Sequence, residues 1–78
     1  MIVLDSYAWI EYFLGSVSGR IVKEYLESEE VCTPSIVLVE VARKYLREGI
    51  NEDDVFRRLL FIVSGSKMTV YLKPSLLK

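Results

Sequence analysis

Short apolar runs alternate with helix-like segments along this chain, and that alternation restricts the possible folds more than any other feature. Residues 2–4 and 31–33 are rich in β-branched side chains, and residues 68–72 form a third run of similar character. Continuous apolar runs of this length are typical of strands buried on both faces of a parallel sheet. Strands that alternate with helices therefore predict an α/β domain.

The segments between these strands have helical spacing and recognisable ends. Gly15 is placed to end a first, strongly apolar helix, and Asn51 is placed to cap the last one. Thr33 is a favourable capping residue and Pro34 suits the first helical position, so we expect the third helix to begin there. The resulting order is strand, helix, helix, strand, helix, helix, strand, which predicts a parallel sheet with helices packed against it.

The chain carries more apolar surface than a domain of its size can easily bury. Hydrophobic residues make up 51% of the 78 residues, whereas a domain this small buries only about 60% of the surface that its unfolded chain exposes. In the last helix we expect the following residues to face inward: Val55, Phe56, Leu59, Leu60 and Val63. We therefore expect a homodimer or higher oligomer, or a chain that was once part of something larger.

Composition excludes several kinds of function. The net charge of −1 provides no global basic field for nucleic acid. The absence of histidine excludes a Ser-His-Asp triad and argues against a structural zinc site. The single cysteine, Cys32, excludes an internal disulfide and suits a reducing compartment. Without a bilayer-spanning segment or a signal peptide, the chain is expected to be cytoplasmic and not to bind membranes.

Two carboxylates are placed where they could carry chemistry. Asp5 follows the first strand directly, at the sheet edge where ligands bind in open α/β folds. Glu40 lies in an apolar stretch of the third helix, which starts at the same edge if the first two strands are neighbours. Both residues also have a structural interpretation. Asp5 could simply cap a helix, and Glu40 could lie on a solvated face and pair with Lys44.

The sequence resembles a known family at these same residues. Residues 2–6 with residues 9–10 resemble the opening of PIN domains, especially of the prokaryotic VapC toxins. Residues 33–41 resemble the second motif of that family, in which a Ser or Thr near the helix start precedes a Glu. The separation of the two carboxylates and the two helices between them also match, and the resemblance extends to about residue 72.

The resemblance implies a three-layer α/β/α fold and a Mg²⁺- or Mn²⁺-dependent endoribonuclease of a type II toxin–antitoxin system. By this resemblance, Asp5 and Glu40 are catalytic residues and metal ligands, and Ser6 supports them. RNA is the implied substrate. A cognate antitoxin that covers the site is the implied partner, and members of the family commonly dimerise.

The match has one serious departure. The family carries further acidic ligands beyond the third strand, and residues 73–78 contain no carboxylate. We therefore expect residues 1–78 to form a single PIN-like domain that is incomplete at the carboxyl terminus and has a half-built active site. An alternative is a non-catalytic PIN remnant that acts as an antitoxin-binding or dimerisation module. A further alternative is a small α/β protein in which Asp5 and Glu40 are incidental.

Overall fold

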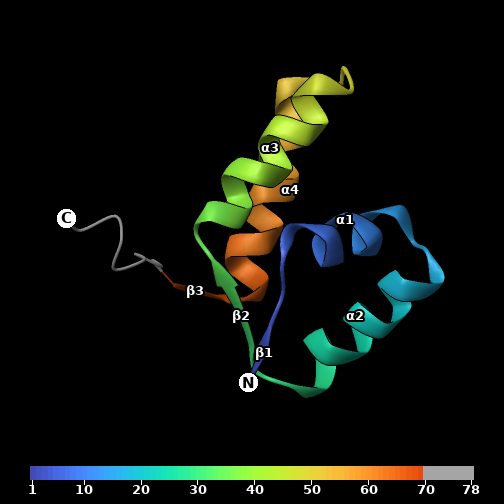
Figure 1. The fold of residues 1–78 in the computed structure, drawn as a ribbon, viewed down its shortest axis with the longest axis vertical. Coiled ribbons are helices and arrows are strands. Elements are labelled where there is room, and N and C mark those ends of the chain that lie inside the picture. Colours follow the sequence, from blue (N-terminus) through green and yellow to red (C-terminus); the bar gives the residue numbers. More distant parts are fainter. Residues whose placement is uncertain (70–78) are drawn as a thin grey trace.

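The computed structural model describes residues 1–69, which form one three-stranded sheet and four helices (Figure 1). The elements in chain order are β1 (Ile2–Val3), α1 (Ser6–Leu14), α2 (Val17–Ser28), β2 (Val31–Pro34), α3 (Ile36–Arg47), α4 (Glu52–Gly65) and β3 (Lys67–Thr69). This order confirms the α/β prediction. The remainder of the third predicted strand, residues 70–72, lies outside the described residues. None of the helices in residues 1–69 has the length and apolar character needed to cross a membrane.

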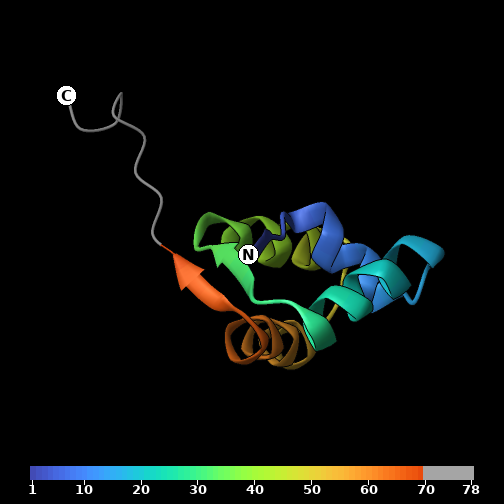
Figure 2. The same ribbon diagram turned by 90° about the horizontal axis from the view of Figure 1, so that it is seen from below.

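The three strands are parallel and lie in the order β1-β2-β3. Val3 pairs with Cys32, and Thr33 pairs with Met68, so β2 is the central strand. Figure 2 shows α3 and α4 on either side of the strands, in agreement with the layered arrangement that we expected. Because the strands are parallel, α1 and α3 both start at the carboxyl edge of the sheet, where β1 and β2 end.

The core lies where α1, α3 and α4 meet the sheet. Trp9, Val41 and Ile62 come from these three helices, and none of their side chains is exposed. The Trp9 ring packs against Phe13 with centroids 6.0 Å apart and against Phe61 with centroids 6.2 Å apart. Aromatic side chains bury more area than most others, so this cluster holds α1 against α4.

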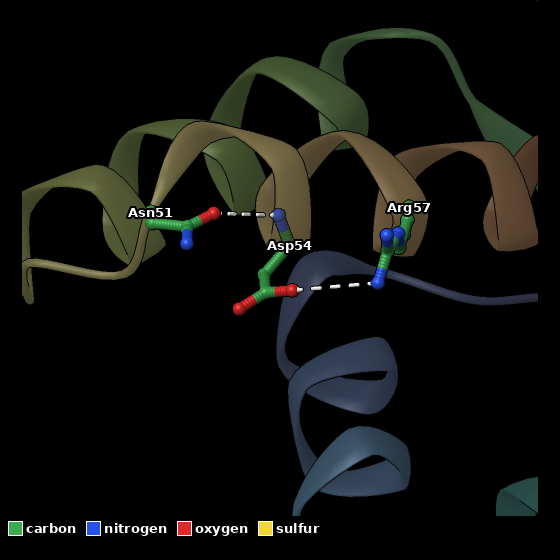
Figure 3. Close-up of polar contacts among 3 residues, drawn as sticks. All are labelled: Asn51, Asp54 and Arg57. Atoms are coloured by element: carbon green, nitrogen blue, oxygen red, sulfur yellow. Dashed lines mark hydrogen bonds and ion pairs between the residues drawn. The ribbon is translucent and has the colours of Figure 1, made fainter.

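The helix ends follow the sequence signals in two of the three predicted cases. Gly15 ends α1 with a φ of 71°, a left-handed conformation that glycine adopts without strain. Asn51 caps α4, because its side chain accepts a hydrogen bond from the Asp54 N–H at 3.0 Å (Figure 3). Both predictions are confirmed.

The predicted start of the third helix is wrong. Thr33 and Pro34 belong to β2, and α3 begins at Ile36 after Ser35, whose side chain makes no capping hydrogen bond. The Thr33 hydroxyl is fully buried and bonded to other elements, so it is not available to cap a helix.

The predicted inward face of α4 is only partly correct. Val55 is buried and Leu59 is partly buried, but Phe56, Leu60 and Val63 are 61%, 51% and 44% exposed. The helix is apolar on two sides, and periodicity alone does not indicate which side meets the core.

Candidate active site

The carboxyl edge of β1 and β2 positions both predicted site residues. These two strands are neighbours, and the last hydrogen bond between them runs from the Leu4 N–H to the Cys32 carbonyl oxygen at 3.0 Å. One residue later the first segment reaches Asp5, and three residues beyond Cys32 the second reaches the start of α3 at Ser35. Asp5 and the helix that carries Glu40 therefore begin at the same edge of the sheet (Figure 1).

Asp5 is both a helix cap and an exposed carboxylate. Its Oδ1 accepts a hydrogen bond from the Ala8 N–H at 2.9 Å, so it caps α1 as the structural interpretation required. Within residues 1–69, its second oxygen accepts no hydrogen bond. The cap fixes the orientation of the carboxyl group and leaves one oxygen able to bind a ligand.

Glu40 lies on the second turn of α3 and is exposed. The predicted pairing with Lys44 is not formed, because the Lys44 ammonium lies 3.0 Å from Glu48 instead. Glu40 makes no ion pair with any other residue in the described part of the chain. The carboxylate is therefore not neutralised by a neighbouring cation there.

Two exposed carboxylates suit a hard divalent cation in chemical terms. Mg²⁺ binds oxygen ligands and keeps several waters, so one or two carboxylates are a sufficient protein contribution to a weak site. Across residues 1–69, however, no three Asp, Glu, His or Cys side chains lie close enough to hold one ion together. The donor type fits Mg²⁺ or Mn²⁺, and the number of donors is low.

A groove of about 420 Å³ extends from this edge between α1 and α3. Its lining residues are Ser6, Tyr7, Ile10, Glu11 and Leu14 of α1, with Lys44, Tyr45 and Glu48 of α3. Ser6 and Tyr7 directly follow Asp5, so the groove begins beside the candidate site. Its wall combines apolar side chains with carboxylates, a surface suited to an apolar segment that carries positive charge.

Two tyrosines in this groove have perturbed acidity. The Tyr7 hydroxyl donates a hydrogen bond to Glu11 Oε1 at 3.2 Å, and the negative charge of Glu11 raises the pKa of Tyr7. Burial raises the pKa of Tyr45, and the positive charge of Arg58 opposes that shift. The Arg58 guanidinium carbon lies 4.5 Å from the centre of the Tyr45 ring, a cation–π contact. Among the described residues the buried Tyr45 hydroxyl has no hydrogen-bond partner.

A buried chain of hydrogen bonds ties the site's supporting elements together. Trp9 Nε1–H donates to Thr33 Oγ1 at 3.0 Å, and the Thr33 hydroxyl donates to Ser66 Oγ at 2.8 Å. The Ser66 hydroxyl then donates to the Ile62 carbonyl oxygen at 2.7 Å. This chain links α1, β2 and the end of α4. Sequence reasoning missed it, although the lone hydroxyl in the apolar run 31–33 was its visible signal.

A comparison with protein-family models matches the PIN domain over residues 2–73. This chain belongs to the PIN domain family. The match covers both strands and both helices that position Asp5 and Glu40. Comparison with curated proteins and with solved structures gave no significant match.

PIN domains form a nuclease-like family whose members generally use divalent metal ions. Membership confirms the family resemblance and the α/β fold that the sequence predicted. It makes nuclease chemistry on nucleic acid the relevant activity class for this chain. It does not distinguish the VapC type from other PIN domains, and it names no metal or partner.

Proposed function

We propose that this PIN domain is of the VapC type and binds Mg²⁺ or Mn²⁺ through Asp5 and Glu40. The observation that supports the proposal is the parallel pairing of β1 with β2, which brings Asp5 and the start of α3 to one edge. Both carboxylates are exposed, so neither needs to be desolvated before it binds an ion. A bound divalent cation would lower the pKa of a coordinated water and supply a nucleophile for phosphodiester hydrolysis.

Each protein residue has a defined task in this proposal. Asp5 would use the oxygen that does not cap α1, and the cap would hold that oxygen in place. Glu40 would approach from the second turn of α3. Ser6 follows Asp5 at the mouth of the groove and would support the ligand geometry there. RNA is the substrate we propose, and the cytoplasm suits the buried free thiol of Cys32.

Metal binding is tested by isothermal titration of Mn²⁺ into the wild-type chain and two variants. Asp5→Asn is a sharp probe, because asparagine caps helices as well as aspartate does but loses the charge. We expect Asp5→Asn and Glu40→Gln each to weaken Mn²⁺ binding by about tenfold or more, since each removes one of few ligands. Glu24→Gln on the exposed side of α2 serves as the control. Equal affinity in all four proteins would contradict the proposal.

Catalysis is expected to be weak in this chain. Within the described residues only these two carboxylates are candidates for the ion, and residues 70–78 contain no Asp or Glu. We expect slow Mg²⁺- or Mn²⁺-dependent cleavage of single-stranded RNA at most, and none with Asp5→Asn. Rapid cleavage that Asp5→Asn abolishes would show that two carboxylates suffice and would overturn the half-built site. Rapid cleavage that survives Asp5→Asn would remove Asp5 from the mechanism.

The groove between α1 and α3 favours a second candidate function, a partner-binding module that binds a cognate antitoxin. Leu14 is 69% exposed in the groove wall, close to the carboxylates of Glu11 and Glu48. Co-expression with the small protein encoded beside this chain tests the idea. We expect a stable complex that Leu14→Arg disrupts and that Val17→Arg, exposed outside the groove lining, leaves intact. No complex, or equal loss with both variants, would contradict this function.

A further inference from the structure

The outer face of α4 carries an apolar stripe that the protein's own described residues do not cover. Phe56, Leu60 and Val63 are spaced four and three residues apart, so they lie along one side of the helix. They are 61%, 51% and 44% exposed. The opposite side of α4 already packs on the core through Val55 and Ile62. Large apolar side chains aligned on one exposed face mark an interaction surface more often than isolated ones do.

Charges flank this stripe asymmetrically. Glu52 and Asp53 precede Phe56 by four and three residues, so they continue the same face at the amino-terminal end. Asp54 is already engaged, because the Arg57 guanidinium lies 3.9 Å from it (Figure 3). At the other end of the helix, Lys67 is exposed directly after Ser66. Neither Glu52 nor Lys67 makes an ion pair with another residue in 1–69.

We propose that this stripe is the contact through which two copies of this chain associate, with the two α4 helices antiparallel. A two-fold axis placed between Leu59 and Leu60 sets Phe56 of each copy opposite Val63 of the other. The same axis sets Glu52 opposite Lys67. One operation therefore matches apolar with apolar and acidic with basic residues, as a symmetric contact requires. Antiparallel packing also places the helix dipoles favourably.

The stripe identifies the surface for the homodimer and is independent of metal binding. α4 is only about 20 Å long, so a single helix pair buries less than the roughly 1,200 Å² of a standard interface. The dimer should therefore be weak and depend on concentration. Figure 2 shows the far side of α4 without another described element against it, which leaves room for a second copy.

Sedimentation equilibrium at low salt, from about 10 µM to about 1 mM chain, measures the association. We expect the wild-type mass to rise toward twice that of the monomer. Leu60→Glu should abolish the rise, because it places two charges at the centre of the contact. Ile21→Glu is the matched control, since Ile21 is 49% exposed on α2 and outside the stripe. A wild type that stays monomeric would overturn the proposal, whether residues 70–78 or nothing covers the stripe. An equal effect of both variants would do the same.

Charge reversal tests the orientation without touching the apolar stripe. Glu52→Lys or Lys67→Glu alone sets like charges against each other at both symmetric contacts, so each should weaken association by about tenfold at low salt. An equimolar mixture of the two variants restores opposite charges at both contacts and should associate at least as well as wild type. Failure of the mixture to associate better than either variant alone would overturn the antiparallel arrangement. Because the readout is mass, the result does not depend on whether Asp5 and Glu40 bind metal.

Discussion

The Tyr45 hydroxyl is the residue-scale feature with the clearest energetic consequence. It is buried and lacks a hydrogen-bond partner among the described residues, so it costs stability that a phenylalanine would not. The ring itself packs against Phe13 and under Arg58, and phenylalanine would keep those contacts. The tyrosine is therefore not explained by packing, and its hydroxyl lies in a residue that lines the groove.

Tyr45→Phe should raise the free energy of unfolding by about 1 kcal/mol at pH 7, measured by urea denaturation. The wild type should also lose stability as the pH rises above 10.0, the ordinary pKa of tyrosine. Burial raises the pKa of Tyr45 in the folded state, so the unfolded chain loses its proton first and the equilibrium moves toward unfolding. Tyr45→Phe should reduce this alkaline loss. A variant less stable than wild type at pH 7 would show that the hydroxyl is paired in solution.

The Thr33 hydroxyl has the opposite role, because both of its bonds are satisfied. Thr33→Val keeps the shape but leaves the Trp9 N–H unpaired in the core, so we expect a loss of about 1–3 kcal/mol in unfolding free energy. Thr33→Ser keeps the hydroxyl and should lose only about 1 kcal/mol for the missing methyl group. Equal losses in the two variants would mean that packing, and not the hydrogen-bond chain, sets the cost.

At the scale of elements, the close crossing of α1 and α2 depends on Gly19. A Cβ at Gly19 would collide with the backbone of Glu11 and Tyr12, and backbone atoms do not move aside as a flexible side chain does. The Ser16 cap fixes the start of α2 by accepting a hydrogen bond from the Gly19 N–H at 3.0 Å. The two helices therefore have little freedom to separate without losing that cap.

Gly19→Ala should destabilise the protein by about 1–3 kcal/mol in thermal or chemical denaturation. Gly65→Ala on α4 is the matched control, because its Cβ would meet only the Trp9 ring at 3.9 Å, an ordinary contact distance. That control should instead gain about 0.5 kcal/mol from the reduced freedom of the unfolded chain. A neutral Gly19→Ala would show that α1 and α2 are not held at this distance.

Sequence reasoning was most successful where a local signal has a single outcome. Gly15 and Asn51 ended and capped their helices as expected, and the apolar runs 2–4 and 31–33 became adjacent parallel strands. It failed where two outcomes share one signal. Thr33 could cap a helix or bond within the core, and only the position of Trp9 decides between them. Phe56 and Leu60 have the same spacing whether they face the core or solvent.

At the scale of the whole molecule, the sheet order determines what the candidate site can be. Because β1 lies beside β2, Asp5 and α3 share one edge, and the groove between α1 and α3 starts there. The sequence predicted that shared edge from the strand–helix alternation. It did not predict that Glu40 would be free of Lys44, since that depends on the choice Lys44 makes between two carboxylates one turn away on either side.

Paramagnetic broadening by Mn²⁺ tests most directly whether the two carboxylates share an ion. Substoichiometric Mn²⁺ is added to ¹⁵N-labelled protein, and the amide signals of Ser6 and Val41, which follow the two carboxylates, are compared with that of Glu24 on α2. We expect the first two signals to broaden together at the same low Mn²⁺ concentration, and Asp5→Asn to weaken both effects. Broadening of only one of them, or of neither, would contradict a shared metal site at this edge of the sheet.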